Sequence, residues 1–192
     1  MSGARIFLAL SHAADIDKLR SFLLSSGYEV IDYASDGSSA IRKIRALRPD
    51  TVMVDIDLPG LSGLEIAKIV EEDGICPAII IKTADQRENL LEDELWDFAY
   101  IVRPISKAAI VQTVNLVITN YRKIQRLVKE IEDLKLTIEA RKVIEKAKGI
   151  MMDTYGLGEK EAFRRMQKQS MDKGIPMKEI GEAIILAYEI GR

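Results

Sequence analysis

The sequence predicts an α/β domain built on a five-stranded, doubly wound parallel sheet, followed by a helical C-terminal region. Three observations lead to this prediction. Short β-rich apolar runs alternate with amphipathic stretches in the first half of the chain, the strand signal ends before Pro104, and helical periodicity continues beyond it. Alternating strands and helices are typical of parallel sheets, because each parallel connection needs a crossover helix.

Each predicted element has a local signal. Gly27 is placed to end the first helix. Asp36 and Ser62 are placed to begin the second and third, because their side-chain oxygens can accept hydrogen bonds from the first helical turn. Such a sheet presents functional groups in the loops that follow its strands. The runs predicted as strands are Ile6–Leu10, Tyr28–Ile31, Thr51–Asp55, Ala78–Lys82 and Phe98–Val102.

Apolar residues beyond Pro104 form a heptad series. Thr113 and Asn120 interrupt its second position, so the seam is strongest after residue 120. β-Branched residues at one core position and Leu at the other favour a two-stranded parallel coiled coil. We therefore predict a homodimer; the alternative is that the stripe packs on its own chain, as residues 110–117 are expected to do. The predicted seam consists of Ile124, Leu127, Ile131, Leu134 and Ile138.

The last part of the chain predicts three helices. One continues the coiled coil to about Thr154, the second runs from Glu159 to about Lys173, and the third from Pro176 to about Ile190. Glycines and Pro176 interrupt the pattern at both joins. The predicted core of this small all-α domain consists of Val143, Ala147, Ile150, Met151, Ala162, Phe163, Met166, Ile180, Ala183, Ile184 and Ala187.

Length and composition limit the function. The 192 residues suffice for two modules, and we expect segments 1–120, 121–138 (the coiled-coil linker) and 139–192. No apolar run approaches the roughly 18 residues that cross a bilayer, so we expect no membrane partner and a cytoplasmic protein. With one cysteine and one histidine, the chain has little material for a disulfide, a zinc cluster or His-dependent catalysis, and we expect no enzyme.

Charge is unevenly distributed along the chain. Residues 1–120 hold 12 basic and 18 acidic side chains, a net −6, whereas residues 121–192 hold 16 and 12, a net +4. A basic second half can attract nucleic acid, with cations following the phosphates and polar side chains reading base edges; the alternative is a solvated charged face. The predicted RNA-binding residues are Lys142, Lys146, Lys148, Arg164, Arg165, Lys168, Gln169, Ser170, Lys173 and Lys178.

The segment from Arg48-Pro49-Asp50 through Asp55 to Gly63-Leu64-Glu65 resembles the receiver domain of two-component response regulators. The resemblance implies a CheY-like, flavodoxin-like fold with Asp55 at the phosphoacceptor position. It also implies that Thr83 is the switch hydroxyl and Tyr100 the switch aromatic, and that Arg103 replaces the usual lysine before a proline.

The chain departs from the receiver pattern where the family binds Mg²⁺. Leu10, Ser11 and His12 stand where that family has an acidic pair, although Mg²⁺ prefers carboxylate and other oxygen ligands. Asp15 is expected only to stabilise the first turn of a helix. Arg103 keeps a positive charge and can clamp Asp55. We expect no cofactor and no ordinary Mg²⁺-dependent phosphorylation. The expected upstream partner is a regulatory protein or a sensor kinase.

The tail resembles the ANTAR domain, an RNA-binding output module of bacterial transcription antiterminators. The resemblance implies binding of a hairpin leader RNA through its loops, which prevents a terminator from forming. It rests on the order of Arg141, Ile144 to Gly149, Met151-Met152, Glu161-Ala162-Phe163, Ser170-Met171, Met177 and Glu179-Ile180.

Two other functions remain open. In the first, the chain is a phosphorylation-activated regulator whose last two helices form a DNA-binding helix-turn-helix. The helix from Pro176 would then read DNA with Lys178 as its only basic residue. In the second, the chain is a signalling adaptor that binds only protein.

Overall fold

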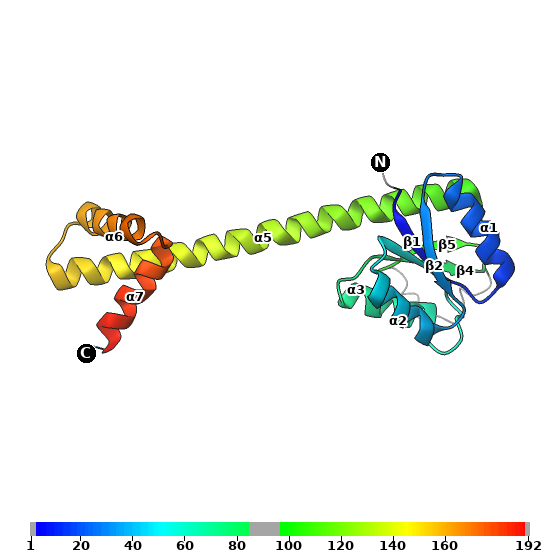
Figure 1. Ribbon diagram of the computed structural model, residues 1–192, viewed down its shortest axis with the longest axis horizontal. Coiled ribbons are helices and arrows are strands. Elements are labelled where there is room, and N and C mark those ends of the chain that lie inside the picture. The colour runs from blue at the N-terminus through cyan, green and yellow to red at the C-terminus, as the bar shows by residue number, and fades with distance from the viewer. Residues whose placement is uncertain (1–2, 85–96, 191–192) are drawn as a thin grey trace. The chain divides into compact units, whose positions relative to one another are not determined.

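The computed structural model describes residues 3–84 and 97–190. It divides into two compact units, Met1–Gln125 and Arg126–Arg192. Helix α5, Lys107–Tyr155, contributes residues to both (Figure 1). Among the described residues, no helix is long and apolar enough to span a membrane.

The first unit has the predicted five-stranded parallel sheet. The strand order is β2-β1-β3-β4-β5, and all four neighbouring pairs run parallel. The doubly wound receiver fold is therefore confirmed. The strands are β1 Arg5–Ala9, β2 Glu29–Ala34, β3 Thr51–Asp55, β4 Ala78–Lys82 and β5 Ala99–Val102, and the shorter helices are α1 Ala13–Leu24, α2 Gly37–Leu47 and α3 Gly63–Glu72.

Helices cover both faces of the sheet (Figure 1). On one face, Val52 and Val54 of β3 pack with α2 and α3. On the other, Met53 packs with α1 and the first part of α5. Side chains of a strand alternate between faces, and a parallel sheet covered on both sides buries them all. β3 and β4 are accordingly buried along their whole length. Because the two strands run parallel, their carboxyl ends lie at the same edge of the sheet.

The predicted helix starts of this unit are confirmed. The carboxylate of Asp36 accepts a hydrogen bond from the Ser39 amide at 2.9 Å. Ser62 forms a capping box, in which its hydroxyl accepts from the Glu65 amide and the Glu65 carboxylate accepts from the Ser62 amide. Helix α1 ends at Leu24, and Gly27 has a φ of 86° in the turn that leads to β2.

The second unit packs α6, Glu159–Lys173, and α7, Met177–Ile190, against the C-terminal part of α5. Its buried core consists of Ala147, Met151, Ala162, Met166 and Ile180. The prediction was wrong for Phe163, Ala183 and Ala187, which are exposed. Ala162 and Met166 lie one above the other on the face of α6 that meets α5. Phe163 directly follows Ala162 and therefore points about 100° away from that face.

Helix α7 approaches α5 closely at Gly181. A Cβ atom at this position would lie 2.9 Å from Cγ1 of Val143 and 3.3 Å from its carbonyl oxygen. The missing side chain therefore allows the two backbones to come together.

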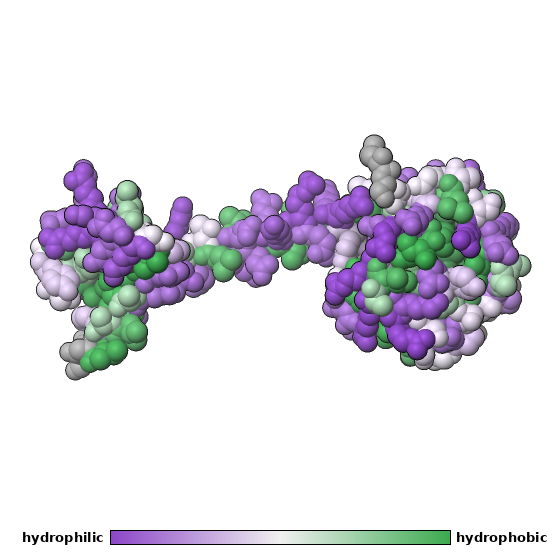
Figure 2. Space-filling view, in the orientation of Figure 1, coloured by the Kyte–Doolittle hydropathy of each residue, from purple (hydrophilic) through white to green (hydrophobic). Residues whose placement is uncertain are grey.

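The predicted seam residues are about half exposed in the single chain. Their exposed fractions range from 47% for Leu127 to 56% for Leu134. Figure 2 shows such apolar side chains at the surface of α5 among hydrophilic ones. The stripe thus remains available to a second helix.

Candidate functional site

Asp55 is the last residue of β3, and only 5% of its side chain is exposed. One carboxylate oxygen, Oδ2, accepts hydrogen bonds from the amide and the hydroxyl of Ser11, both at 3.1 Å. The other, Oδ1, lies 2.5 Å from Nη2 of Arg103. The main chain of Asp55 passes close to Gly63. A Cβ atom at position 63 would lie only 2.3 Å from the Asp55 carbonyl oxygen, so a side chain there would clash. Both side-chain oxygens of Asp55 are therefore engaged within the protein.

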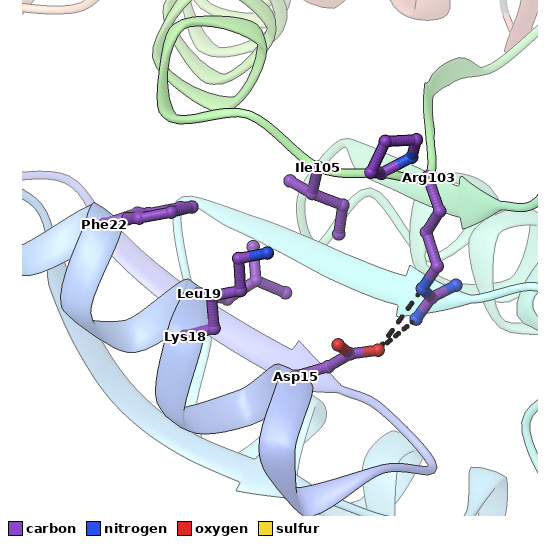
Figure 3. Close-up of a pocket in the computed structure, with 7 residues that line it drawn as sticks. Asp15, Lys18, Leu19, Phe22, Arg103 and Ile105 are labelled. Carbon is purple, nitrogen blue, oxygen red and sulfur yellow. Dashed lines mark hydrogen bonds and ion pairs between the residues drawn. The ribbon is translucent and has the colours of Figure 1, made fainter.

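Arg103, which follows β5, holds a second carboxylate. Its Nε and Nη2 atoms donate to Oδ2 of Asp15 at 3.2 and 2.9 Å (Figure 3). Burial lowers the pKa of Arg103, but its hydrogen bonds to Asp55 and Asp15 outweigh that effect and raise the pKa overall. The guanidinium stays charged and links α1, β3 and the end of β5. The expected contact between Arg103 and Asp55 is confirmed.

The Asp15–Arg103 ion pair separates two cavities of the receiver. One, of about 320 Å³, holds Thr83 with Asp55 and Ser11 in its lining. The other, of about 360 Å³, is lined by the apolar side chains of Leu19, Phe22 and Ile105 and by Lys18 (Figure 3). Asp15 and Arg103 line both.

Tyr100 lies outside the lining of these cavities and is 43% exposed. The ammonium of Lys82 sits 4.3 Å from the centre of its ring, within the range of a cation–π interaction. Lys82 is 95% buried, and the sequence did not single it out because its ring partner is on the neighbouring strand. Asp15 was also missed as a partner of Arg103, since 88 residues separate them and no local signal joins them.

Lys148 was expected outside the core but is only 7% exposed, while its predicted contact with RNA stays a prediction. Its ammonium donates to carboxylates of Glu145 and Glu159, each at 2.8 Å. Hydrogen bonds to Glu145 and then Glu159 raise the pKa of Lys148. Lys148 therefore ties α5 to the first turn of α6 rather than presenting a free cation.

Ser170 has a structural contact as well, and its predicted contact with RNA stays a prediction. Its hydroxyl donates to the Ile175 carbonyl oxygen at 2.6 Å and so closes the turn between α6 and α7. Four other predicted cations form ion pairs at the surface, where such pairs contribute little and exchange easily. These pairs are Lys142–Glu139, Lys146–Glu189, Arg165–Glu161 and Lys178–Glu182.

Three predicted RNA-binding residues come together at one groove. Arg165, Gln169 and Lys173 follow each other at intervals of four on α6 and line a groove of about 640 Å³. Tyr155 and Tyr188 line it too. The sequence did not predict either tyrosine as a site residue, because no motif or spacing links them to the other lining residues. Arg164 and Lys168 are exposed on α6 but do not line this groove.

A parallel α/β domain with an aspartate at the end of its third strand, joined to a helical unit, is the organisation expected of a response regulator. Comparison with protein families agrees. The response regulator receiver domain model matches residues 6–115, and the ANTAR domain model matches residues 132–185. The chain belongs to the response regulators and carries a C-terminal ANTAR domain.

Similar proteins match either nearly the whole chain or about three fifths of it. The transcriptional regulatory protein PdtaR of Mycobacterium tuberculosis H37Rv is 30% identical over 183 residues, 94% of this chain and 89% of the relative. PilH of Pseudomonas aeruginosa is 28% identical over 123 residues, 60% of this chain and 98% of that protein. The receiver domain of a modulated diguanylate cyclase from Desulfovibrio desulfuricans has a TM-score of 0.58 at 24% identity, covering 62% of this chain and 97% of that one, and supports the fold alone.

The resemblance to receivers implied an acidic pair beside Asp55, and other side chains stand there. Ser11 and His12 replace the acidic pair and hydrogen-bond each other at 2.8 Å, while Asp15 is held by Arg103. Within residues 3–84 and 97–190, no group of three or more His, Cys, Asp or Glu side chains is arranged to hold a metal ion. The local cation at Asp55 is a guanidinium.

Proposed function

We propose that this protein is a transcription antitermination regulator that binds hairpin leader RNA through its ANTAR domain, as a dimer. The observation that carries the proposal is the ANTAR match over residues 132–185, together with the stripe of Arg165, Gln169 and Lys173 on α6. Cations at this spacing can follow phosphates, while an amide can read a base edge.

Dimerisation is supported by the half-exposed seam from Ile124 to Ile138. Large apolar side chains at both core positions of a heptad gain free energy when a second helix covers them. A parallel pair presents two ANTAR domains, which suits an RNA with two hairpin loops.

We propose that a regulatory protein controls the receiver, without ordinary Mg²⁺-dependent phosphorylation of Asp55. The support is the Arg103 clamp, which supplies a positive charge at Asp55 from within the protein. A partner that contacts the receiver can change its state without chemistry at that residue.

The experiment is a salt titration of binding to a synthetic RNA with two tandem stem-loops, its sequence taken from transcripts crosslinked to the protein in cells. Arg165→Ala and Lys173→Ala should each lower the slope of log affinity against log salt, by about 0.7 to 0.9 for each phosphate that is no longer neutralised. Arg45→Ala is the matched control, since it removes an exposed, ion-paired arginine of the receiver.

Three results would contradict the proposal. Unchanged slopes in both α6 variants would place the RNA elsewhere. Tighter binding of duplex DNA in the same assay would favour a DNA-binding output. The negative charges of Glu179 and Glu182 on α7 disfavour that alternative, because they would repel DNA phosphates. Absence of salt-dependent RNA binding would favour an adaptor that binds only protein.

A further inference from the structure

The groove of the second unit has a composition that the charge pattern alone does not explain. It is formed by the end of α5, one face of α6 and one face of α7. Its lining consists of Ile150, Met151, Thr154, Tyr155, Arg165, Gln169, Lys173, Ile180, Ala183, Ile184, Ala187 and Tyr188. We propose that this groove receives an unstacked nucleobase of the bound RNA, an inference that rests on the proposed function.

The lining combines the three kinds of contact that a flipped base uses. Isoleucines and Met151 offer an apolar floor, and Tyr155, 65% exposed, offers an aromatic face for stacking. Gln169 can form paired hydrogen bonds with a base edge. Arg165 and Lys173 lie one helical turn on either side of it, where they can meet the flanking phosphates. At about 640 Å³, the groove lies within the roughly 300–1,000 Å³ typical of small-molecule sites.

Small side chains keep the groove open. Ala183 and Ala187 lie one turn apart on α7 and line it, which accounts for their exposure at positions where a core was expected. Larger residues at either position would fill the space between α7 and α6. The two alanines of α7 and the polar side chains of α6 thus line the same groove.

The groove also lies away from the predicted dimer seam. Ile150 and Thr154 follow Ile138 by 12 and 16 residues on the same helix. At 100° per residue they point about 120° and 160° around the axis from it. A second copy that covers the seam therefore leaves the groove accessible. A purely apolar peptide would not use the Arg165, Gln169 and Lys173 stripe, which favours a ligand that carries phosphates.

The test places 2-aminopurine singly at each loop position of the two-stem-loop RNA and follows its fluorescence with the full-length protein. At one loop position, binding should change the fluorescence in a way that depends on Tyr155. Tyr155→Ala should weaken binding roughly 5- to 150-fold, the range for loss of one base–aromatic stack, with the salt slope unchanged. Tyr155→Phe keeps the ring and should bind as the parent does.

A second variant blocks the groove without removing a charge or a ring. Ala187→Phe should abolish the Tyr155-dependent signal and weaken binding while the salt slope is retained. Leu186→Phe is its matched control, because Leu186 is 58% exposed on the same helix and does not line the groove. Far-ultraviolet circular dichroism and thermal melting verify that each variant is folded.

The outcomes separate this inference from the proposed function. If the parent protein shows no salt-dependent RNA binding, the proposed function fails. If it binds RNA but Tyr155→Ala and Ala187→Phe change neither affinity nor fluorescence, the groove does not hold a base and the RNA-binding function stands. If Ala187→Phe dissociates the dimer in sedimentation, a second copy occupies the groove and the inference is overturned.

Discussion

Nη2 of Arg103 lies 2.5 Å from Oδ1 of Asp55, so the residue at the phosphoacceptor position is already ion-paired within the receiver. Arg103 also binds Asp15, and its two carboxylate partners leave it fully charged. An arginine in this place supplies a positive charge to Asp55 from within the protein.

We expect that acetyl phosphate with Mg²⁺ will not phosphorylate Asp55. The carboxylate oxygens of Asp55 already accept hydrogen bonds from Arg103 and Ser11. The acidic pair that would bind the Mg²⁺ needed for phosphoryl transfer is replaced by Ser11 and His12. Intact-mass spectrometry after incubation measures the added phosphoryl group. The Asp55→Asn variant is the control for phosphorylation at other residues. Stoichiometric addition of a phosphoryl group to the parent, absent from Asp55→Asn, would contradict the prediction.

Charge introduced into the seam should prevent dimerisation. Ile131→Asp combined with Leu134→Asp places four like charges on the buried side of the paired helices, and the variant should sediment as a monomer. Sedimentation velocity over a range of concentrations measures this. Lys129→Asp, on the opposite side of the heptad, should leave the parent's behaviour unchanged. If the parent protein sediments as a monomer at every concentration, the proposed dimer is wrong.

The Lys148–Glu159 pair should make the ANTAR domain sensitive to acid. The hydrogen bond from Lys148 lowers the pKa of Glu159, so the pair stabilises the fold above the ordinary pKa of a glutamate. This stabilisation is lost as the pH falls through the lowered pKa. Glu159→Gln should flatten the fall in thermal midpoint between neutral and acidic pH, followed by circular dichroism at 222 nm.

The matched control for that experiment is Glu161→Gln, in the same helical turn. Glu161 pairs with the exposed Arg165 and does not contact Lys148. Its variant should keep the parent's pH profile. Equal flattening in both variants would mean that Lys148 has no special role in the acid response.

Gly181→Ala should destabilise the ANTAR domain although alanine favours helices. The new Cβ would lie 2.9 Å from Cγ1 of Val143, a side chain with little rotational freedom, and overpacking costs about 1–3 kcal/mol. Gly149→Ala is the opposite case, because no atom lies within 4 Å of its added Cβ. It should gain about 0.5–1 kcal/mol from helix propensity. Hydrogen exchange of α7 amides measures both; shifts of the same sign would refute the packing argument.

Much of the fold could be predicted because its signals are local. Asp36 and Ser62 cap their helices through residues three positions away, and the helices of the tail begin and end close to the predicted positions. Phe163 shows where a local pattern is insufficient. Its apolar character suggested burial, but whether a face of α6 is covered depends on where α5 and α7 lie.

The sequence by itself determined the order of strands and helices, the aspartate after β3, the heptad seam and the basic character of the tail, since these are carried by residue type and short-range spacing. Tertiary structure alone decided that Arg103 joins Asp15 to Asp55, that Lys148 is buried between two glutamates, and that a stripe of α6 meets Tyr155 and Tyr188 at one groove. These contacts join distant segments, and packing of the whole chain decides which distant side chains meet.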